Sequence, residues 1–286
     1  MEVIKAKLRL YWPLIKSMQT ALLVITGLAG FMSTRCPLLN WKTTLAVAGS
    51  LFLAVSGSTI LNMWYDRDID AKMKRTQKRP LPSGELSPRE ALILGLIVSA
   101  LGVGWALTMD WLYGLVVFAG LFFDVVVYTI WLKRRTPWSI VWGGISGGMP
   151  VLAGRTLGTG HIEWIGIVLA LAILFWIPTH ILTFSMRYRE DYARAGVPTF
   201  PSAYGDRVTQ TIIAGSSVIA SLLMIVAAYG IGLTVGYLRL MAVLSAGMLL
   251  LALGSAIRPS ENLNFGLFKY ASLYMLSAMT LMMFVV

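Results

Sequence analysis

Residues 41–70 read Trp41-Lys-Thr-Thr-Leu-Ala-Val-Ala-Gly-Ser-Leu-Phe-Leu-Ala-Val-Ser-Gly-Ser-Thr-Ile-Leu-Asn62-Met-Trp-Tyr-Asp66-Arg-Asp68-Ile-Asp70. An apolar run therefore leads directly into a cluster of acids. The run at 41–63 is long enough to cross a bilayer, since a hydrocarbon core of ~30 Å needs about 20 apolar residues in a helix. The stretch predicts a transmembrane helix that ends in a polar site.

The whole chain repeats this pattern. Of its 286 residues, 57% are hydrophobic and 13% are charged, whereas soluble domains carry roughly 25% charged residues. We therefore expect an all-α integral membrane protein, with one polytopic domain over residues 1–286 and about nine transmembrane helices. The run at 138–155 is the weakest, because four glycines and Pro150 interrupt it. The nine runs lie at 14–34, 41–63, 90–109, 111–132, 138–155, 163–186, 208–232, 237–256 and 264–286.

The net charge of +11 follows the predicted topology. If the N-terminus lies inside, most Lys and Arg fall in inner segments, as the positive-inside rule requires. We expect an N-in, C-out protein in the plasma membrane, because no organellar presequence precedes the first run, and no nucleic-acid partner. The basic inner positions are Lys5, Lys7 and Arg9, Arg67 through Arg89, Lys133 to Arg135, Arg187 to Arg207, and Arg258.

Three oxygen-bearing side chains follow the second run at intervals of four. If the helix continues to Asp70, then Asn62, Asp66 and Asp70 share one face. Such a set suits Mg²⁺, which prefers oxygen ligands and completes its shell with substrate phosphates. Asp68 lies about 200° round the helix from Asp66, so we expect it outside the metal site.

Cations follow these acids within a few turns. Lys72, Arg75 and Arg79 supply charged donors of the kind that a diphosphate needs. The alternative is that the charges solvate a loop and fix topology. The acid–cation order, the period of four and the Pro80-Leu-Pro-Ser-Gly84 stop favour the diphosphate site.

A second inner polar segment follows the sixth run. Arg187 and Asp191 are again four apart, and the closing Gly84 and Gly205 fall equally far after Asp70 and Asp191. This similarity indicates a weak internal duplication, in which each half contributes one polar cap to a shared site.

Four further polar residues lie at the ends of the predicted spans or inside them. A basic cluster ends the fourth run; it is a stop-transfer signal, or else Tyr128 and Lys133 reach the same diphosphate. His180 is either a hydrogen-bonded packing residue or an acceptor-binding group. Asp124 lies inside a span, where an acid is costly and is by default a functional candidate; the alternative is a hydrogen-bonded pair with another helix, for example with Lys16.

These motifs resemble those of the intramembrane UbiA-type prenyltransferase superfamily, which pairs an Asn-x-x-x-Asp-x-x-x-Asp motif after the second helix with a second acidic motif after the sixth. Within the superfamily, the likeness is greatest to the protoheme IX farnesyltransferases, or heme O synthases. It covers roughly residues 10 to 210. The matching stretches are Asn62 through Thr76, Arg79-Pro80-Leu81 with Gly84, Tyr128-Thr129, Leu132 to Pro137, Gly143-Gly144 with Gly147 and Pro150, Trp176-x-Pro178-x-His180, and Glu190 to Pro198.

The resemblance implies a bundle around a central cavity with an inner polar cap. It implies transfer of a farnesyl group from farnesyl diphosphate to heme b, with Mg²⁺ as cofactor and membrane lipid as surroundings. The roles that it implies are Mg²⁺ binding by Asn62, Asp66, Asp70 and Asp191; diphosphate binding by Lys72, Arg75, Arg79 and Lys133, beside Arg187 of the second motif; Tyr128 near the allylic carbon; and His180 at the heme.

Departures from the pattern keep other acceptors open. Thr179 replaces the second Pro of the usual Pro-Pro-His, and Arg187 stands where the wider superfamily has an acid. The alternatives are the same chemistry on a quinone precursor, a glycerol phosphate or a chlorophyllide. A membrane transporter is the alternative of another class, although transporters hold their ions near the midplane and not at the rim.

Overall fold

The computed structural model describes residues 9–36, 40–258 and 260–283. Lys5, Lys7 and the last three residues of the ninth predicted run lie outside this part. The described residues form helices and no strand, as expected for an all-α protein. The elements are η1 (Trp12–Ile15), α2 (Ser17–Met32), α3 (Trp41–Tyr65), α4 (Arg67–Asp70), α5 (Pro88–Met109), α6 (Trp111–Phe122), η2 (Phe123–Leu132), α7 (Ser139–Thr159), α8 (Trp164–Arg187), α9 (Arg189–Ala195), α10 (Phe200–Ile231), α11 (Val235–Ile257) and α12 (Glu261–Met283).

Six helical stretches in the described part are long and apolar enough to cross a membrane: α3, α5, α6 with η2, α8, α10 and α11. A seventh span results if Arg9–Ile15 and α2, which meet at a bend of 49°, are taken together. Helices α7 and α12 lie where two further spans are predicted but do not meet the same criterion. The protein is therefore a multi-pass membrane protein, and the count of nine and the N-in, C-out orientation stay predictions.

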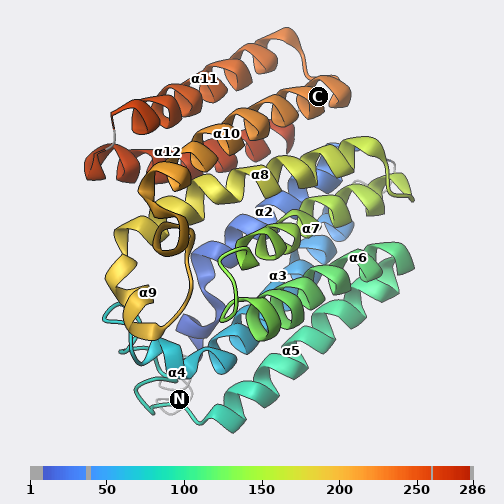
Figure 1. Cartoon of the computed structure of the whole chain (residues 1–286). Helices are drawn as coiled ribbons and strands as arrows, with labels where there is room; N and C mark the ends of the chain where they lie inside the picture. Colours follow the sequence, from blue (N-terminus) through green and yellow to red (C-terminus); the bar gives the residue numbers. More distant parts are fainter. Residues whose placement is uncertain (1–8, 37–39, 259, 284–286) are drawn as a thin grey trace.

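The helices pack as a bundle whose neighbours are often distant in sequence. Helix α3 packs along α5, α2 along α7, and α8 along α10, while α12 contacts both α8 and α2. Figure 1 shows the short helices α4 and α9 at the same end of this bundle. The two predicted polar segments therefore meet at one end, as a shared cap requires.

The weak fifth run forms one continuous helix, and glycines further along it pack closely against α2. Helix α7 is continuous from Ser139 to Thr159, with Pro150 inside it. An added Cβ at Gly154 would come within 2.0 Å of Gly27 O, and one at Gly30 within 2.2 Å of Val151 O. Small residues let membrane helices approach backbone to backbone, so these glycines bring α2 and α7 into contact.

The two polar segments share two backbone features. In each, a long helix is followed at once by a short one: α3 by α4, and α8 by α9. The closing glycines, Gly84 and Gly205, adopt φ values of 80° and 79°, a region that favours glycine. The predicted duplication remains a prediction that this similarity supports.

The close approach of α2 and α7 leads to a stability prediction. Gly154→Ala places a methyl group against the Gly27 carbonyl, and overpacking of this kind costs about 1–3 kcal/mol. We expect a lower Tm for the detergent-solubilised variant than for the wild type. Gly104→Ala in α5 is the control, since its added Cβ meets nothing within 4 Å; an equal loss in both variants would contradict the packing argument.

Candidate functional site

Asn62, Asp66 and Asp70 form a buried row at the end of α3, here called the oxygen row. Helix α3 ends at Tyr65, but the hydrogen bonds from Asp66 N to Asn62 O (2.9 Å) and from Asp70 N to Asp66 O (2.8 Å) carry the helical pattern through to α4. The three residues are 7%, 2% and 6% exposed. Because helical positions four apart stack on one face, the three side chains lie on a common buried face.

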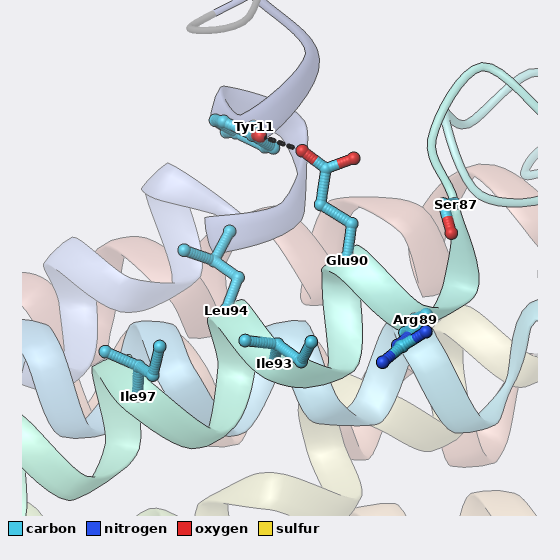
Figure 2. A pocket seen from close by; sticks show the side chains of 7 residues that line it. All are labelled: Tyr11, Ser87, Arg89, Glu90, Ile93, Leu94 and Ile97. Atoms are coloured by element: carbon cyan, nitrogen blue, oxygen red, sulfur yellow. Dashed lines mark hydrogen bonds between the residues drawn. The ribbon is translucent and has the colours of Figure 1, made fainter.

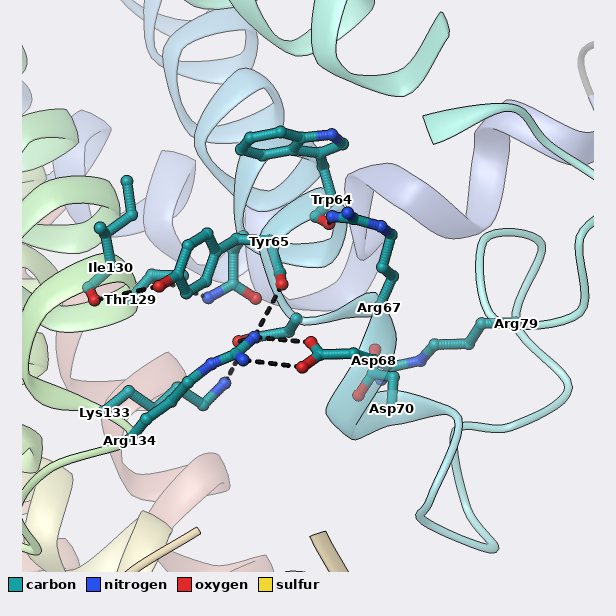
Figure 3. Close-up of polar contacts among 12 residues, drawn as sticks. Trp64, Tyr65, Arg67, Asp68, Asp70, Arg79, Thr129, Ile130, Lys133 and Arg134 are labelled. Atoms are coloured by element: carbon teal, nitrogen blue, oxygen red, sulfur yellow. Dashed lines mark hydrogen bonds and ion pairs between the residues drawn. The ribbon is translucent and has the colours of Figure 1, made fainter. Parts of the chain in front are cut away.

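Each member of the oxygen row has its own cation. Lys16 Nζ donates to Asn62 Oδ1 at 2.9 Å, Lys133 Nζ donates to Asp66 Oδ2, and Arg79 Nη1 donates to Asp70 Oδ2 at 2.7 Å. Figure 3 shows Lys133 and Arg134 approaching from one side of α4 and Arg79 from the other. A buried carboxylate is stable only when it is paired, so these cations are part of what holds the row in place.

Lys133 stays charged in this setting. Burial acts to lower the pKa of its ammonium group, but the attractions of Tyr128 and Asp66 outweigh burial and raise the pKa above the usual lysine value. A lysine that keeps its proton beside a buried acid is a fixed positive charge. It is available to a diphosphate oxygen as well as to Asp66.

Asp68 lies outside the oxygen row, as its position on the helix predicts. Its side chain is 55% exposed and forms two hydrogen bonds of 2.7 Å with Arg134. These bonds hold the pKa of Asp68 below its usual value. The Arg134 pair makes Asp68 a suitable control position for the acids of the row.

The oxygen row fits a hard divalent cation. Among the described residues, the buried Asp66 Oδ1 has no hydrogen-bond partner, and its ion-pair contact with Arg134 Nη2 is long, at 3.7 Å. In the described part of the chain, no three His, Cys, Asp or Glu side chains are placed so that they could hold a metal ion by themselves. Mg²⁺ does not require such a group, because it binds one or two carboxylates and takes its remaining ligands from substrate phosphates and water.

Asp191 ties the second polar segment to the first. Its carboxylate accepts hydrogen bonds from the backbone N–H groups of Lys74 (3.1 Å) and Arg75 (3.3 Å) and from Arg194 Nη2 (3.1 Å). The side chain is buried. The predicted meeting of the two segments is therefore present, and it is made through the backbone that follows α4.

The other predicted diphosphate-binding residues lie around this cap. Lys72 is exposed. The Arg75 guanidinium lies 4.9 Å from the Phe184 ring centroid and 5.5 Å from that of Tyr188. Arg187 lies 4.0 Å from the Phe265 ring centroid on α12, so its contact is with that helix and not with the oxygen row.

A cavity of about 790 Å³ adjoins the cap, between α2, α3, α6–η2, α7, α8 and α12. Its lining is mostly apolar, with polar side chains that include Ser58, Asp124, Tyr128 and His180. The Tyr128 ring centroid lies 5.6 Å from Lys133 Nζ. The cavity wall therefore reaches the cation that pairs with Asp66, and Tyr128 lies between the apolar space and the polar cap.

His180 is a hydrogen-bonded packing residue, which is one of the two alternatives that the sequence left open, and acceptor binding stays a prediction. Its ring stacks between Trp176 and Phe268, with centroids 5.0 Å and 4.5 Å away, and its Nδ1 lies 3.1 Å from Ser272 Oγ. It also lines the cavity. A hydrogen-bonded, stacked imidazole thus forms part of the apolar wall.

Sequence reasoning missed several partners. Asp124 accepts a hydrogen bond from Ser58, on another helix as expected, whereas Lys16 bonds Asn62. Thr129 accepts from Asn62 Nδ2 at 2.8 Å. The charge of Lys16 inside a predicted span was a usable signal; nothing in the local sequence of Ser58 or Thr129 points to these pairs.

Comparison with known proteins identifies the fold and the chemistry. Residues 23–274 match the model of the UbiA prenyltransferase family. A protein of Archaeoglobus fulgidus named protoheme IX farnesyltransferase is 40% identical over 278 residues, covering 96% of this chain and 95% of that protein. A protein of Pyrobaculum arsenaticum with the same name is 42% identical over 205 residues, which cover 71% of this chain and 73% of that protein.

Solved structures share the architecture. A digeranylgeranylglyceryl phosphate synthase superposes with a TM-score of 0.80 at 20% identity, covering 100% of this chain and 99% of that one. A UbiA homolog from Archaeoglobus fulgidus bound to GPP and Mg²⁺ superposes with a TM-score of 0.68 at 18% identity, covering 96% and 98%. At these identities the likeness shows the fold. Together with the family match over most of its length, it identifies the chain as a membrane-embedded prenyltransferase of the UbiA family.

Proposed function

We propose that this prenyltransferase transfers a farnesyl group from farnesyl diphosphate to heme b, with Mg²⁺ bound at the oxygen row. The observation that carries the proposal is the oxygen row with its cations, set next to an apolar cavity that contains His180. The relatives named protoheme IX farnesyltransferase support the choice of donor and acceptor.

The diphosphate half of the reaction belongs to the polar cap. Asn62, Asp66 and Asp70 would hold Mg²⁺, with Asp191 as a proposed further ligand, since a carboxylate has about four lone-pair sites and can keep its backbone contacts. Mg²⁺ held there would supply positive charge to the diphosphate oxygens while the allylic C–O bond breaks.

The cations of the cap complete the charge balance. Lys133 and Arg79 stabilise the departing diphosphate through charge-assisted hydrogen bonds. Lys72 and Arg75 follow on the segment that Asp191 holds, and Arg187 supplies a further charge at the rim. Lys133, Arg79, Lys72 and Arg75 act on the leaving group and not on the acceptor. Arg187, which packs on Phe265 of α12, adds only to the positive charge of the rim.

The acceptor half belongs to the cavity. The C–O bond electrons leave with the diphosphate, and the allylic carbon forms a new bond to a vinyl carbon of heme b. Water then adds to the remaining cationic carbon and loses a proton, which gives the hydroxyl group of the product. The apolar walls keep other water from the allylic cation, and Tyr128 lies beside its path. His180, whose ring faces pack against Trp176 and Phe268, is a polar group that the cavity wall offers to the acceptor.

The acids of the oxygen row should control ionisation of the donor. Asp66→Asn and Asp70→Asn each remove a carboxylate that would hold Mg²⁺, and loss of one such stabilising group lowers rates by about 10²–10³-fold. We expect that loss in pyrophosphate release from farnesyl diphosphate. Asp68→Asn is the matched control and should retain the wild-type rate; a loss equal to that of Asp66→Asn would contradict the assignment.

Metal removal provides a separate check. Treatment with EDTA should abolish pyrophosphate release, because the cations of the cap alone do not neutralise the leaving group. Addition of Mg²⁺ in excess of the chelator should restore it. Full activity in EDTA, measured after dialysis against metal-free buffer, would refute the role of Mg²⁺.

The acceptor is tested by product identification. Membranes that contain the protein are incubated with heme b and farnesyl diphosphate, and the products are analysed by mass spectrometry. We expect the mass of heme b plus a farnesyl group and a hydroxyl group. Prenylation of a quinone precursor or a glycerol phosphate, with no farnesylated heme, would overturn the acceptor assignment and leave the donor chemistry intact.

A further inference from the structure

We propose that Lys16 is a positioning residue of the diphosphate site, which fixes the Asn62 carboxamide and adds a third cation beside the oxygen row. This inference rests on the proposed function, since it assigns a role within the same donor half. Lys16 comes from the junction between η1 and α2, far from α3 in sequence. Its ammonium nevertheless lies 2.9 Å from Asn62 Oδ1.

Lys16 determines which way the Asn62 amide points. An ammonium group can only donate hydrogen bonds, so the atom that faces Lys16 has to be the amide oxygen. At the other end of the amide, the Thr129 hydroxyl donates its proton to Asp124 O at 2.7 Å and therefore accepts from Asn62 Nδ2. Both ends of the amide are thus specified, and the second lone pair of Oδ1 remains available to a metal ion.

The same contact completes a series of cations. Asn62, Asp66 and Asp70 lie one helical turn apart, and their partners are Lys16, Lys133 and Arg79 in that order. The cations therefore parallel the oxygen row. One of the three N–H groups of Lys16 serves Asn62, so a diphosphate bound at this row would meet further donors from the same ammonium.

The backbone at Lys16 is held in a costly conformation. Its φ of 45° and ψ of 58° are left-handed, a region that a residue with a Cβ rarely adopts. This residue forms the 49° bend between Arg9–Ile15 and α2. Strained positions persist only where surrounding contacts impose them, and they cluster at functional sites.

Contacts on the N-terminal side hold this bend. The Tyr11 hydroxyl donates to Glu90 at the pocket beside α5, as Figure 2 shows. Leu14 is fully buried, and its carbonyl accepts a hydrogen bond from Thr59 Oγ1 at 3.1 Å. The segment is thus fixed to α3 and α5, and the fixed bend aims the Lys16 side chain at Asn62.

The test measures binding of farnesyl thiodiphosphate, a slowly ionising donor analogue, in the presence of Mg²⁺ by isothermal titration calorimetry. Lys16→Met should raise the Kd at least about ten-fold, since charge-assisted hydrogen bonds of this kind are lost. Lys16→Gln keeps an N–H donor for Asn62 without the charge, so its Kd should lie between those of Lys16→Met and the wild type. Lys16→Arg should restore most of the affinity.

Two further variants separate a positioning role from a structural one. Lys16→Gly suits a positive φ, so it should keep the wild-type Tm and still bind the analogue weakly. Arg35→Met is the matched control: Arg35 is also a cation with positive φ (51°), it flanks the other end of α2, and its change should leave Kd unaltered.

The outcomes distinguish this inference from the proposed function. If the wild type does not bind the analogue with Mg²⁺, both are overturned. If the wild type binds and Lys16→Met binds equally well, or Arg35→Met loses as much affinity, then only the role of Lys16 is overturned. The role of Lys16 is supported if affinity falls progressively from Lys16→Arg through Lys16→Gln to Lys16→Met while Lys16→Gly keeps the wild-type Tm.

Discussion

Two buried carboxylates have to be balanced by positive charge, and the arrangement of the polar end of this protein follows from that requirement. Asp66 and Asp70 are almost inaccessible, and an unpaired charge in such a place costs several kcal/mol. Their cations come from different parts of the chain: Lys133 from the end of η2, and Arg79 from the segment after α4. The ion pairs thus connect segments that no local interaction would join.

The same requirement links the polar cap to the apolar cavity. Tyr128 lines the cavity and lies near Lys133, so the η2 segment belongs to both. η2 is a π-helix, a form that is rare and is frequent at functional sites. The chain therefore places the leaving-group site and the dry space for the allylic carbon on one continuous wall. This contiguity is what a prenyl transfer needs, because the cation must form where water is excluded.

Much of this was accessible from sequence. Apolar runs located the long helices because crossing a membrane demands about 20 apolar residues, and the interval of four placed Asn62, Asp66 and Asp70 on one face while it excluded Asp68. The partners were not accessible. Lys16 forms a hydrogen bond with Asn62, and Ser58 forms one with Asp124. Which polar groups pair depends on how η1, α3 and η2 are positioned in space.

The glycine-rich run at 138–155 was predicted as the weakest span, and α7 does not meet the length and hydropathy criterion that six other stretches meet. The sequence did not show that α7 is nevertheless one continuous helix whose small residues pack closely: an added Cβ at Gly148 would lie 2.8 Å from Ala170 O on α8. The local pattern of a packed glycine and of a helix-breaking glycine is the same. Only the neighbouring helix decides between them, and sequence periodicity does not contain that neighbour.

The central claim is that one buried helical face holds the metal and the diphosphate at the mouth of the cavity. The most direct measurement is an anomalous difference map from crystals grown with Mn²⁺, in place of Mg²⁺, and farnesyl thiodiphosphate. We expect an Mn²⁺ peak coordinated by Asp66 and Asp70 with the Asn62 amide oxygen, and the farnesyl chain in the cavity past Tyr128. A metal peak away from these side chains, with the diphosphate bound elsewhere, would contradict it.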